Sequence, residues 1–171
     1  MENNETVQIR RAWPEDIPLI RSIADIAFRD TYRDILSPAQ MEYMMDWMYS
    51  EESLEAQMNR LGHVYFLCGD RGYASFRKEG STEDGRELYH LEKIYVLPSE
   101  QGTGLGRRLF ETVTSYIRTI SSGHPRVELN VNRKNPALGF YEHLGMQKVR
   151  SGDFPIGHGF YMNDYIMGLD L

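Results

Sequence analysis

The chain has 171 residues, of which 41% are hydrophobic and 26% charged, the composition of an ordinary globular domain. An aromatic content of 12% excludes disorder as the main state. The 19 Lys and Arg residues against 25 Asp and Glu residues give a net charge of −6. This charge argues against a nucleic-acid partner and suits a cationic substrate better. We expect one domain spanning residues 1–171.

Cys68 is the only cysteine, so the chain cannot form an internal disulfide or a cysteine-based zinc cluster. It lies within the apolar run 64–68, which predicts a buried, unreactive thiol. Residues 1–5 lack the basic start and apolar stretch of a signal peptide, and no apolar run reaches the roughly 18 residues of a membrane span. The sequence therefore predicts a cytoplasmic protein with no membrane contact.

The first third of the chain has the pattern of one strand and three helices. Alternation over residues 7–11 predicts a short strand, and Pro14 followed by two acids marks the start of a helix. Ser37-Pro38 is a second helix start, which leads into a stripe of methionines that we interpret as core. A third, short helix is expected over 52–60.

The rest of the chain alternates between strands and helices. Strands are expected over 63–69, 72–78, 88–97, 127–131, 146–150 and 161–169, and helices over 104–120 and 136–144. Residues 79–86 and 151–160 are rich in glycine and polar residues and are predicted to be loops. The order predicts one mixed α/β domain.

One segment combines a strand end, a glycine-rich turn and a helix start. The strand over 91–98 is followed by Gln101-Gly102-Thr103-Gly104-Leu105-Gly106. Glycines allow the backbone to approach a ligand, and free N–H groups at a helix start can bind a pyrophosphate, with Arg107 and Arg108 adding positive charge. A plain tight turn explains such a segment about as well. The dinucleotide-binding motif Gly-x-Gly-x-x-Gly does not fit, because its last glycine would fall on Arg107 or on Leu109. The Gly-Lys-Ser/Thr triplet of a nucleotide P-loop does not occur in the chain.

The remaining pattern, Gln-x-x-Gly-x-Gly after a strand, resembles the acetyl-CoA loop of the GCN5-related N-acetyltransferases (GNAT). A second block, Asn135-Pro136-Ala137-Leu138-Gly139-Phe140-Tyr141 up to Gly145-Met146, is similar to a later motif of that family, with Met146 in place of the usual Phe. The resemblance is close over residues 88–146. It implies a mixed, mostly antiparallel, twisted sheet flanked by helices on both faces, with acetyl-CoA as the co-substrate. The closing residues 163–167 also resemble the end of bacterial members that acetylate polyamines.

The resemblance assigns roles to individual residues. The backbone of Ile94, Tyr95 and Val96 would pair with the pantetheine arm, and Asn135 would hydrogen-bond the cofactor. The pyrophosphate would be wrapped by Gln101, Gly102, Thr103, Gly104, Leu105, Gly106 and Arg107.

The chemistry of acetyl transfer requires a neutral amine, a stabilised oxyanion and a proton for the leaving thiolate. We predict Tyr141 as the general acid, against the alternative that it only packs on its helix. Glu92 is a candidate base because two-residue spacing places it on the same strand face as Ile94. The alternatives are that Glu92 is an ion-paired surface charge, paired with Lys93 or Arg86, and that His90 or water acts as the base. The other histidines lack ligand spacing, so no metal is expected.

The resemblance places the acceptor between residues 28–49 and 151–161. An acidic, aromatic pocket there would contain Tyr32, Asp34, Tyr43, Trp47, Asp153 and Phe154, although Tyr43 and Trp47 more simply belong to a core helix face. Small amines, polyamines and protein amines remain open as acceptors. The alternative function is a non-catalytic acyl-CoA-binding regulatory module. A homodimer is possible, with the strand over 161–169 as the expected place for pairing.

Overall fold

The computed structural model describes residues 6–171, so the expectation for residues 1–5 lies outside the described part. Its strands are β1 (Ile9–Ala12), β2 (Val64–Cys68), β3 (Gly72–Ser81), β4 (Glu87–Val96), β5 (Arg126–Asn132), β6 (Gln147–Gly157) and β7 (Phe160–Asp170). Its helices are α1 (Ile17–Tyr32), α2 (Pro38–Tyr49), α3 (Glu51–Asn59), α4 (Leu105–Ile120) and α5 (Ala137–His143), with short 3-10 turns η1 (Pro14–Asp16) and η2 (Pro98–Glu100).

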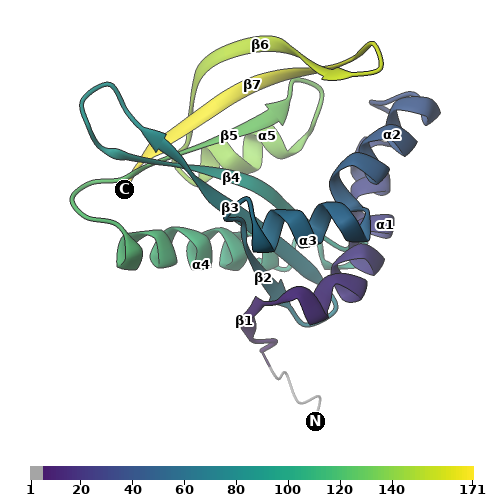
Figure 1. Cartoon of the computed structure of the whole chain (residues 1–171), viewed down its shortest axis with the longest axis horizontal. Helices are drawn as coiled ribbons and strands as arrows, with labels where there is room; N and C mark the ends of the chain where they lie inside the picture. Colours follow the sequence, from purple (N-terminus) through teal and green to yellow (C-terminus); the bar gives the residue numbers. More distant parts are fainter. Residues whose placement is uncertain (1–5) are drawn as a thin grey trace.

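The strands form one seven-stranded twisted sheet in the order β1-β2-β3-β4-β5-β7-β6 (Figure 1). All neighbouring strands are antiparallel except β4 and β5, which are parallel. Helices α1–α3 pack on one face of the sheet and α4 and α5 on the other, each against its own apolar cluster. The predicted fold class is confirmed.

The starts of α2 and α4 follow from local chemistry. The Ser37 hydroxyl accepts a hydrogen bond from the Gln40 amide at 3.2 Å, which satisfies one free N–H of the first turn of α2. Helix α4 is preceded by its N-cap residue, Gly104, whose φ of +84° lies in the left-handed region that favours glycine. The glycine-rich turn is therefore needed to bring the chain from β4 into α4.

The structure corrects the two predicted loops. Strand β3 continues to Ser81, and β6 continues through most of the segment 151–160. The turn of the β6–β7 hairpin is short, with positive φ at Gly157, His158 and Gly159. Strand β6 lies at the edge of the sheet, where Pro155 is tolerated because no further strand needs its missing N–H. The glycines and Pro155 that predicted a loop over 151–160 are therefore residues that a strand at the edge of a sheet can contain.

Strand β7 lies between β5 and β6, and its residues 164–168 are paired on both edges. The expectation that the strand over 161–169 pairs with a second copy is therefore wrong for 164–168, whereas residues 161–163 have register partners on β6 alone. The outer strands of the sheet are β1 and β6.

The methionine helix is only partly core. Met41 and Met44 are buried as predicted, whereas Trp47 is 48% exposed and Tyr43 is half-buried, which corrects the simpler assignment of both aromatics to the core. Cys68 is fully buried, and burial raises the pKa of its thiol. This agrees with an unreactive cysteine.

Candidate active site

The site begins where β4 and β5 separate. Their parallel pairing has three register pairs, of which His90 and Glu128 form the last, and the strands then diverge. A cavity of about 800 Å³ occupies the divergence, between the end of α1, the start of α4 and α5. Its wall contains every residue predicted for catalysis and cofactor binding except Thr103, and both Tyr32 and Asp34 among the predicted substrate residues. Asp153 and Phe154 do not line it.

The cofactor end of the cavity is formed by the glycine-rich turn and the start of α4. Gly102 and Gly104 both have positive φ, at +81° and +84°, and a Cβ on either would meet no atom within 4 Å. The turn therefore presents open backbone to the cavity, and the first N–H groups of α4 are suited to an anion.

The two arginines after this turn differ. Arg107 lines the cavity, is 64% exposed and pairs with Glu111 at 2.9 Å, one turn further along α4. Arg108 instead donates to the Val7 carbonyl at 2.6 Å, on the opposite side of α4. The prediction that Arg108 adds charge to the site is wrong, because this contact anchors it to the segment before β1.

Asn135 joins β5 to α5. Its side-chain oxygen accepts a hydrogen bond from the Ala137 amide at 2.9 Å, which fixes the start of α5, and the residue is 8% exposed. Its amide nitrogen is left to donate toward the cavity, whose wall also contains Tyr32. Burial raises the pKa of the Tyr32 hydroxyl, and hydrogen bonding to Tyr95 and Asn135 opposes this only in part.

Three tyrosines meet in the cavity wall. The hydroxyls of Tyr32 and Tyr95 are 3.2 Å apart, and Tyr141 lies close enough to Tyr32 to be influenced by it electrostatically. Burial raises the pKa of Tyr141, so its hydroxyl keeps its proton at neutral pH. The described residues provide no hydrogen-bond partner for this hydroxyl, which is therefore available to a ligand.

A β-bulge in β4 changes the expected position of Glu92. Ser75 pairs with Lys93 and Phe76 with Leu91, so Glu92 is the extra residue. Leu91 and Ile94 consequently pack in the same cluster on the α4 side, although they are three residues apart. The assumption that Glu92 and Ile94 share a strand face is wrong, because the bulge interrupts the alternation.

Glu92 nevertheless lines the cavity. Its carboxylate accepts a hydrogen bond from Arg77 Nε at 2.6 Å and is 23% exposed. The ion pair weighed in the sequence exists, with Arg77 of the neighbouring strand in place of Lys93 or Arg86. His90, in contrast, is 15% exposed and faces Glu79 at 3.3 Å, so it is neither solvent-exposed nor unpaired.

Lys93 is a residue that sequence analysis did not single out. Its side chain is buried and contacts the Gln57 side-chain oxygen at 2.9 Å, the Tyr65 hydroxyl at 2.6 Å and the Met48 carbonyl at 3.3 Å. Burial lowers the pKa of Lys93 to about 7. A lysine within the apolar strand segment 91–97 was the available signal. Lys93 ties the bulge in β4 to α2 and α3, which cover this side of the cavity.

Replacing Lys93 with Met is expected to stabilise the protein, by about 2 kcal/mol near pH 6 and by less near pH 9. The folded chain loses the Lys93 proton at a lower pH than the unfolded chain, so this residue's contribution to stability rises with pH above about 7. Thermal unfolding of both forms across this pH range measures the effect. Lys78→Met, at an exposed lysine paired with Glu87, is the control. If K93M changed the free energy of unfolding equally near pH 6 and near pH 9, Lys93 would not lose its proton between these pH values in the folded chain.

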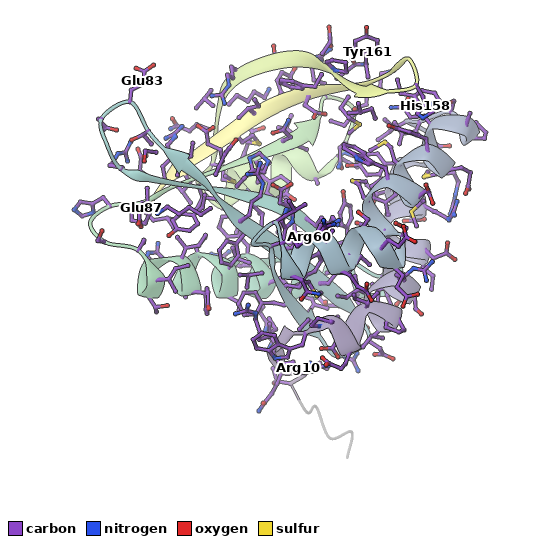
Figure 2. All side chains as sticks on the ribbon, in the orientation of Figure 1. Arg10, Arg60, Glu83, Glu87, His158 and Tyr161 are labelled. Atoms are coloured by element: carbon purple, nitrogen blue, oxygen red, sulfur yellow. The ribbon has the colours of Figure 1, made fainter. Side chains whose placement is uncertain are left out.

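Outside the cavity wall, α2 and the β6–β7 hairpin contact each other, and Figure 1 shows the hairpin reaching toward α2. Tyr43 donates to the Ile156 carbonyl at 2.5 Å, and Gln40 donates to the Tyr161 carbonyl at 2.8 Å. Tyr43 also packs against His158 and Phe160 at the hairpin tip, where Figure 2 shows the labelled His158 next to α2. We call this the α2–hairpin contact.

The remaining predicted substrate residues lie outside the cavity wall. Asp153 is 62% exposed and paired with Arg133, and the Phe154 ring lies over Gly152 on the same strand. Trp47 stacks on Tyr43 at the surface of α2. The predicted aromatic, acidic pocket is therefore only partly assembled, with Tyr32 and Asp34 at the cavity.

Two further findings concern the described residues as a set. Between residues 6 and 171, no group of three His, Cys, Asp or Glu side chains is placed to hold a metal ion. Within the same range, none of the helices has the length and apolarity needed to cross a bilayer.

Comparison with known proteins identifies the family. Residues 60–148, just over half of the chain, match the model of the acetyltransferase (GNAT) domain. An uncharacterised N-acetyltransferase of Lactobacillus delbrueckii subsp. lactis, from the pepI 3′ region, is 28% identical over 161 residues, covering 88% of this chain and 90% of the relative.

Solved structures share the fold. The PaiA N-acetyltransferase of Thermoplasma acidophilum, in complex with coenzyme A, superposes with a TM-score of 0.74 at 18% identity, covering 96% of this chain and 98% of that one. A GCN5-related N-acetyltransferase of Rhodopseudomonas palustris gives a TM-score of 0.78 at 18% identity, covering 98% and 97%.

Proposed function

The chain belongs to the GNAT acetyltransferase family and is an acetyl-CoA-dependent acyltransferase, and we propose that it transfers the acetyl group directly to a primary amine. The observation that carries the proposal is the cavity where β4 and β5 diverge, with an unpartnered, protonated Tyr141 hydroxyl in its wall among the described residues. Direct transfer is supported by Cys68, which is fully buried and so cannot carry the acetyl group.

The proposed reaction assigns one step to each group. Glu92, directly or through water, takes the excess proton of the amine, and the amine nitrogen then attacks the thioester carbonyl carbon. Backbone N–H groups at Ile94 to Val96 stabilise the oxyanion, since β4 has no β5 partner there. The C–S bond then breaks, and Tyr141 donates its proton to the CoA thiolate. The amide nitrogen gives its remaining excess proton to the Tyr141 phenolate through water, which restores Tyr141, and Glu92 releases its proton to solvent.

The raised pKa of Tyr141 is compatible with this role. A tyrosine with a raised pKa stays protonated at neutral pH and so still has a proton to donate, but it gives that proton up reluctantly. A thiolate formed in the same buried cavity is destabilised by the same loss of solvent, so the proton affinities of donor and acceptor rise together. Tyr141 therefore remains a suitable acid.

The proposed acceptor is a small amine. The α2–hairpin contact closes the acceptor side with side chains and hydrogen bonds, which favours a slender acceptor over an amine on a folded protein surface. The possible homodimer stays a prediction, with the outer edge of β6 available for strand pairing.

Release of CoA thiol from acetyl-CoA in the presence of an amine panel tests the function. The panel should contain alkyl monoamines, diamines, amino acids, aminoglycosides and lysine peptides. Turnover with at least one amine is expected. Acetyl-CoA binding without turnover on any amine would support the alternative, a non-catalytic acyl-CoA-binding module.

Opening the α2–hairpin contact is expected to weaken acceptor binding. In Gly157→Ala the new Cβ would lie 2.5 Å from the Tyr43 hydroxyl at a backbone φ of +99°, so the tip of the hairpin must move. We expect KM for the amine to rise about 10-fold with kcat changed less, because uniform binding is lost. Steady-state kinetics with the best amine of the panel measures this.

Gly159→Ala is the matched control, since its φ of +76° carries similar strain but its Cβ meets no atom within 4 Å. Equal KM values for the two variants would show that turn strain, and not the contact with Tyr43, determines acceptor binding.

A further inference from the structure

One carboxylate near the acceptor side differs from its neighbours. On the sheet face that carries α1–α3, Glu92 pairs with Arg77, Glu79 with His90, and Glu128 with both Arg126 and Arg150. Asp164 of β7 lies on the same face but has no cationic side chain in salt-bridge contact among residues 6–171.

The Asp164 carboxylate is buried and half satisfied. The residue is 2% exposed, and Oδ2 accepts a hydrogen bond from Asn130 Nδ2 at 3.2 Å. Oδ1 is also buried and has no hydrogen-bond partner among the described residues. The nearest guanidinium, Arg133, donates instead to Asp153 and to the carbonyls of Gly152 and Asp164.

Asp164 does not line the cavity itself but contacts one residue of its wall. Asn130, its hydrogen-bond donor, lines the cavity, and so does Tyr32, whose pKa is raised by burial and, to a smaller extent, by the charge of Asp164. Tyr32 also contacts Tyr95 and interacts with Tyr141. Tyr32 therefore connects the reacting end, at Tyr141, with Asp164.

A buried carboxylate without a cation in direct contact is unfavourable. Desolvation raises the pKa of Asp164, and the Asn130 hydrogen bond and the more distant charges of Arg133 and His90 offset this only in part. An ammonium group of a ligand would supply the missing donor and the missing charge together. Asn130 is an exposed side chain, so it can turn aside to admit such a group. The aromatic ring of Tyr32 adds a favourable surface for a cation.

We propose that Asp164 binds a second cationic group of the acceptor, so that the preferred substrates are diamine-like compounds with one reacting amine and one ammonium held by Asp164. This inference rests on the proposed function. It also changes the predicted acidic residue of the substrate pocket from Asp153, which is exposed and paired, to Asp164.

Diaminobutane and pentylamine test the proposal, because they have the same length and differ by one terminal ammonium. We expect wild-type kcat/KM to be about 100-fold higher for diaminobutane, and Asp164→Asn to abolish most of that preference while changing kcat/KM for pentylamine by less than about 3-fold. Asp170→Asn is the matched control, because Asp170 lies on the same strand and pairs with Arg86 and Arg126. It is expected to change neither value.

A second measurement needs no turnover. Diaminobutane should raise the thermal unfolding midpoint of wild type, pentylamine should not, and D164N should lose the response. If D164N fails to fold, Asp164→Glu, which keeps the charge but extends it by one methylene, should shift the preference to a shorter diamine.

The outcomes separate the two proposals. Equal use of diaminobutane and pentylamine by wild type, or a D164N effect that is the same on both, overturns the role of Asp164 and leaves the acetyltransferase function intact. Failure to acetylate any amine of the panel overturns the proposed function, and a missing thermal response to diaminobutane then overturns the role of Asp164 as well.

Discussion

Replacing Tyr141 with Phe is expected to lower kcat about 1000-fold, within the range of effects of a lost general acid. The substitution removes one oxygen, and among residues 6–171 that oxygen has no hydrogen-bond partner to leave unsatisfied. The fold and the affinity for acetyl-CoA should therefore be retained. Single-turnover kinetics, with acetyl-CoA binding measured by calorimetry, would separate chemistry from binding.

Tyr116→Phe is the matched control for this prediction. Tyr116 is on α4, where its hydroxyl contacts Arg11 outside the cavity, so kcat should stay within about 2-fold of wild type while stability falls slightly. Unchanged kcat in Tyr141→Phe would assign Tyr141 to packing on α5 and leave the thiolate to be protonated by water.

Replacing Glu92 with Gln is expected to lower kcat/KM about 100-fold, because the amine then has no carboxylate to take its proton. The shape of the side chain is preserved, and Arg77 can still donate to the amide oxygen. The measurement is kcat/KM with a single amine.

Glu79→Gln is the control, since Glu79 is also a carboxylate of this sheet face in contact with a basic side chain, His90. We expect a change of less than about 3-fold. His90→Gln distinguishes the remaining alternative: if it lowers kcat/KM about 100-fold and Glu92→Gln does not, the base is His90.

Most of the fold was predictable from local patterns. The Ser37 cap, the apolar stripe of α4 and the glycine-rich turn all act within a few residues, and the structure places these elements within one or two residues of their expected bounds. The β6–β7 hairpin was not predictable in the same way. Its glycines and Pro155 have the composition of a loop, and only the position of β6 at the sheet edge makes a strand acceptable.

The cofactor end of the site was also predictable, because its residues are close together in the sequence. The acceptor end depends on contacts between distant segments. The bulge at Glu92 appears only when β4 is aligned with β3, and the isolation of Asp164 only when its neighbours on β5 and β6 are known. No periodicity in a single strand contains that information.

The short pairing between β4 and β5 has a consequence for the mechanics of the protein. Strands β1–β4 and strands β5–β7 are each held by long antiparallel pairings, whereas three register pairs join the two sets. This seam is the natural place for partial opening, so the amides beside it should exchange hydrogen faster than those within either set. A pantetheine arm lying in the divergence would substitute for the missing ladder. Bound acetyl-CoA would then hold strands β1–β4 and β5–β7 together in addition to reacting, and its release after each turnover would weaken this connection again.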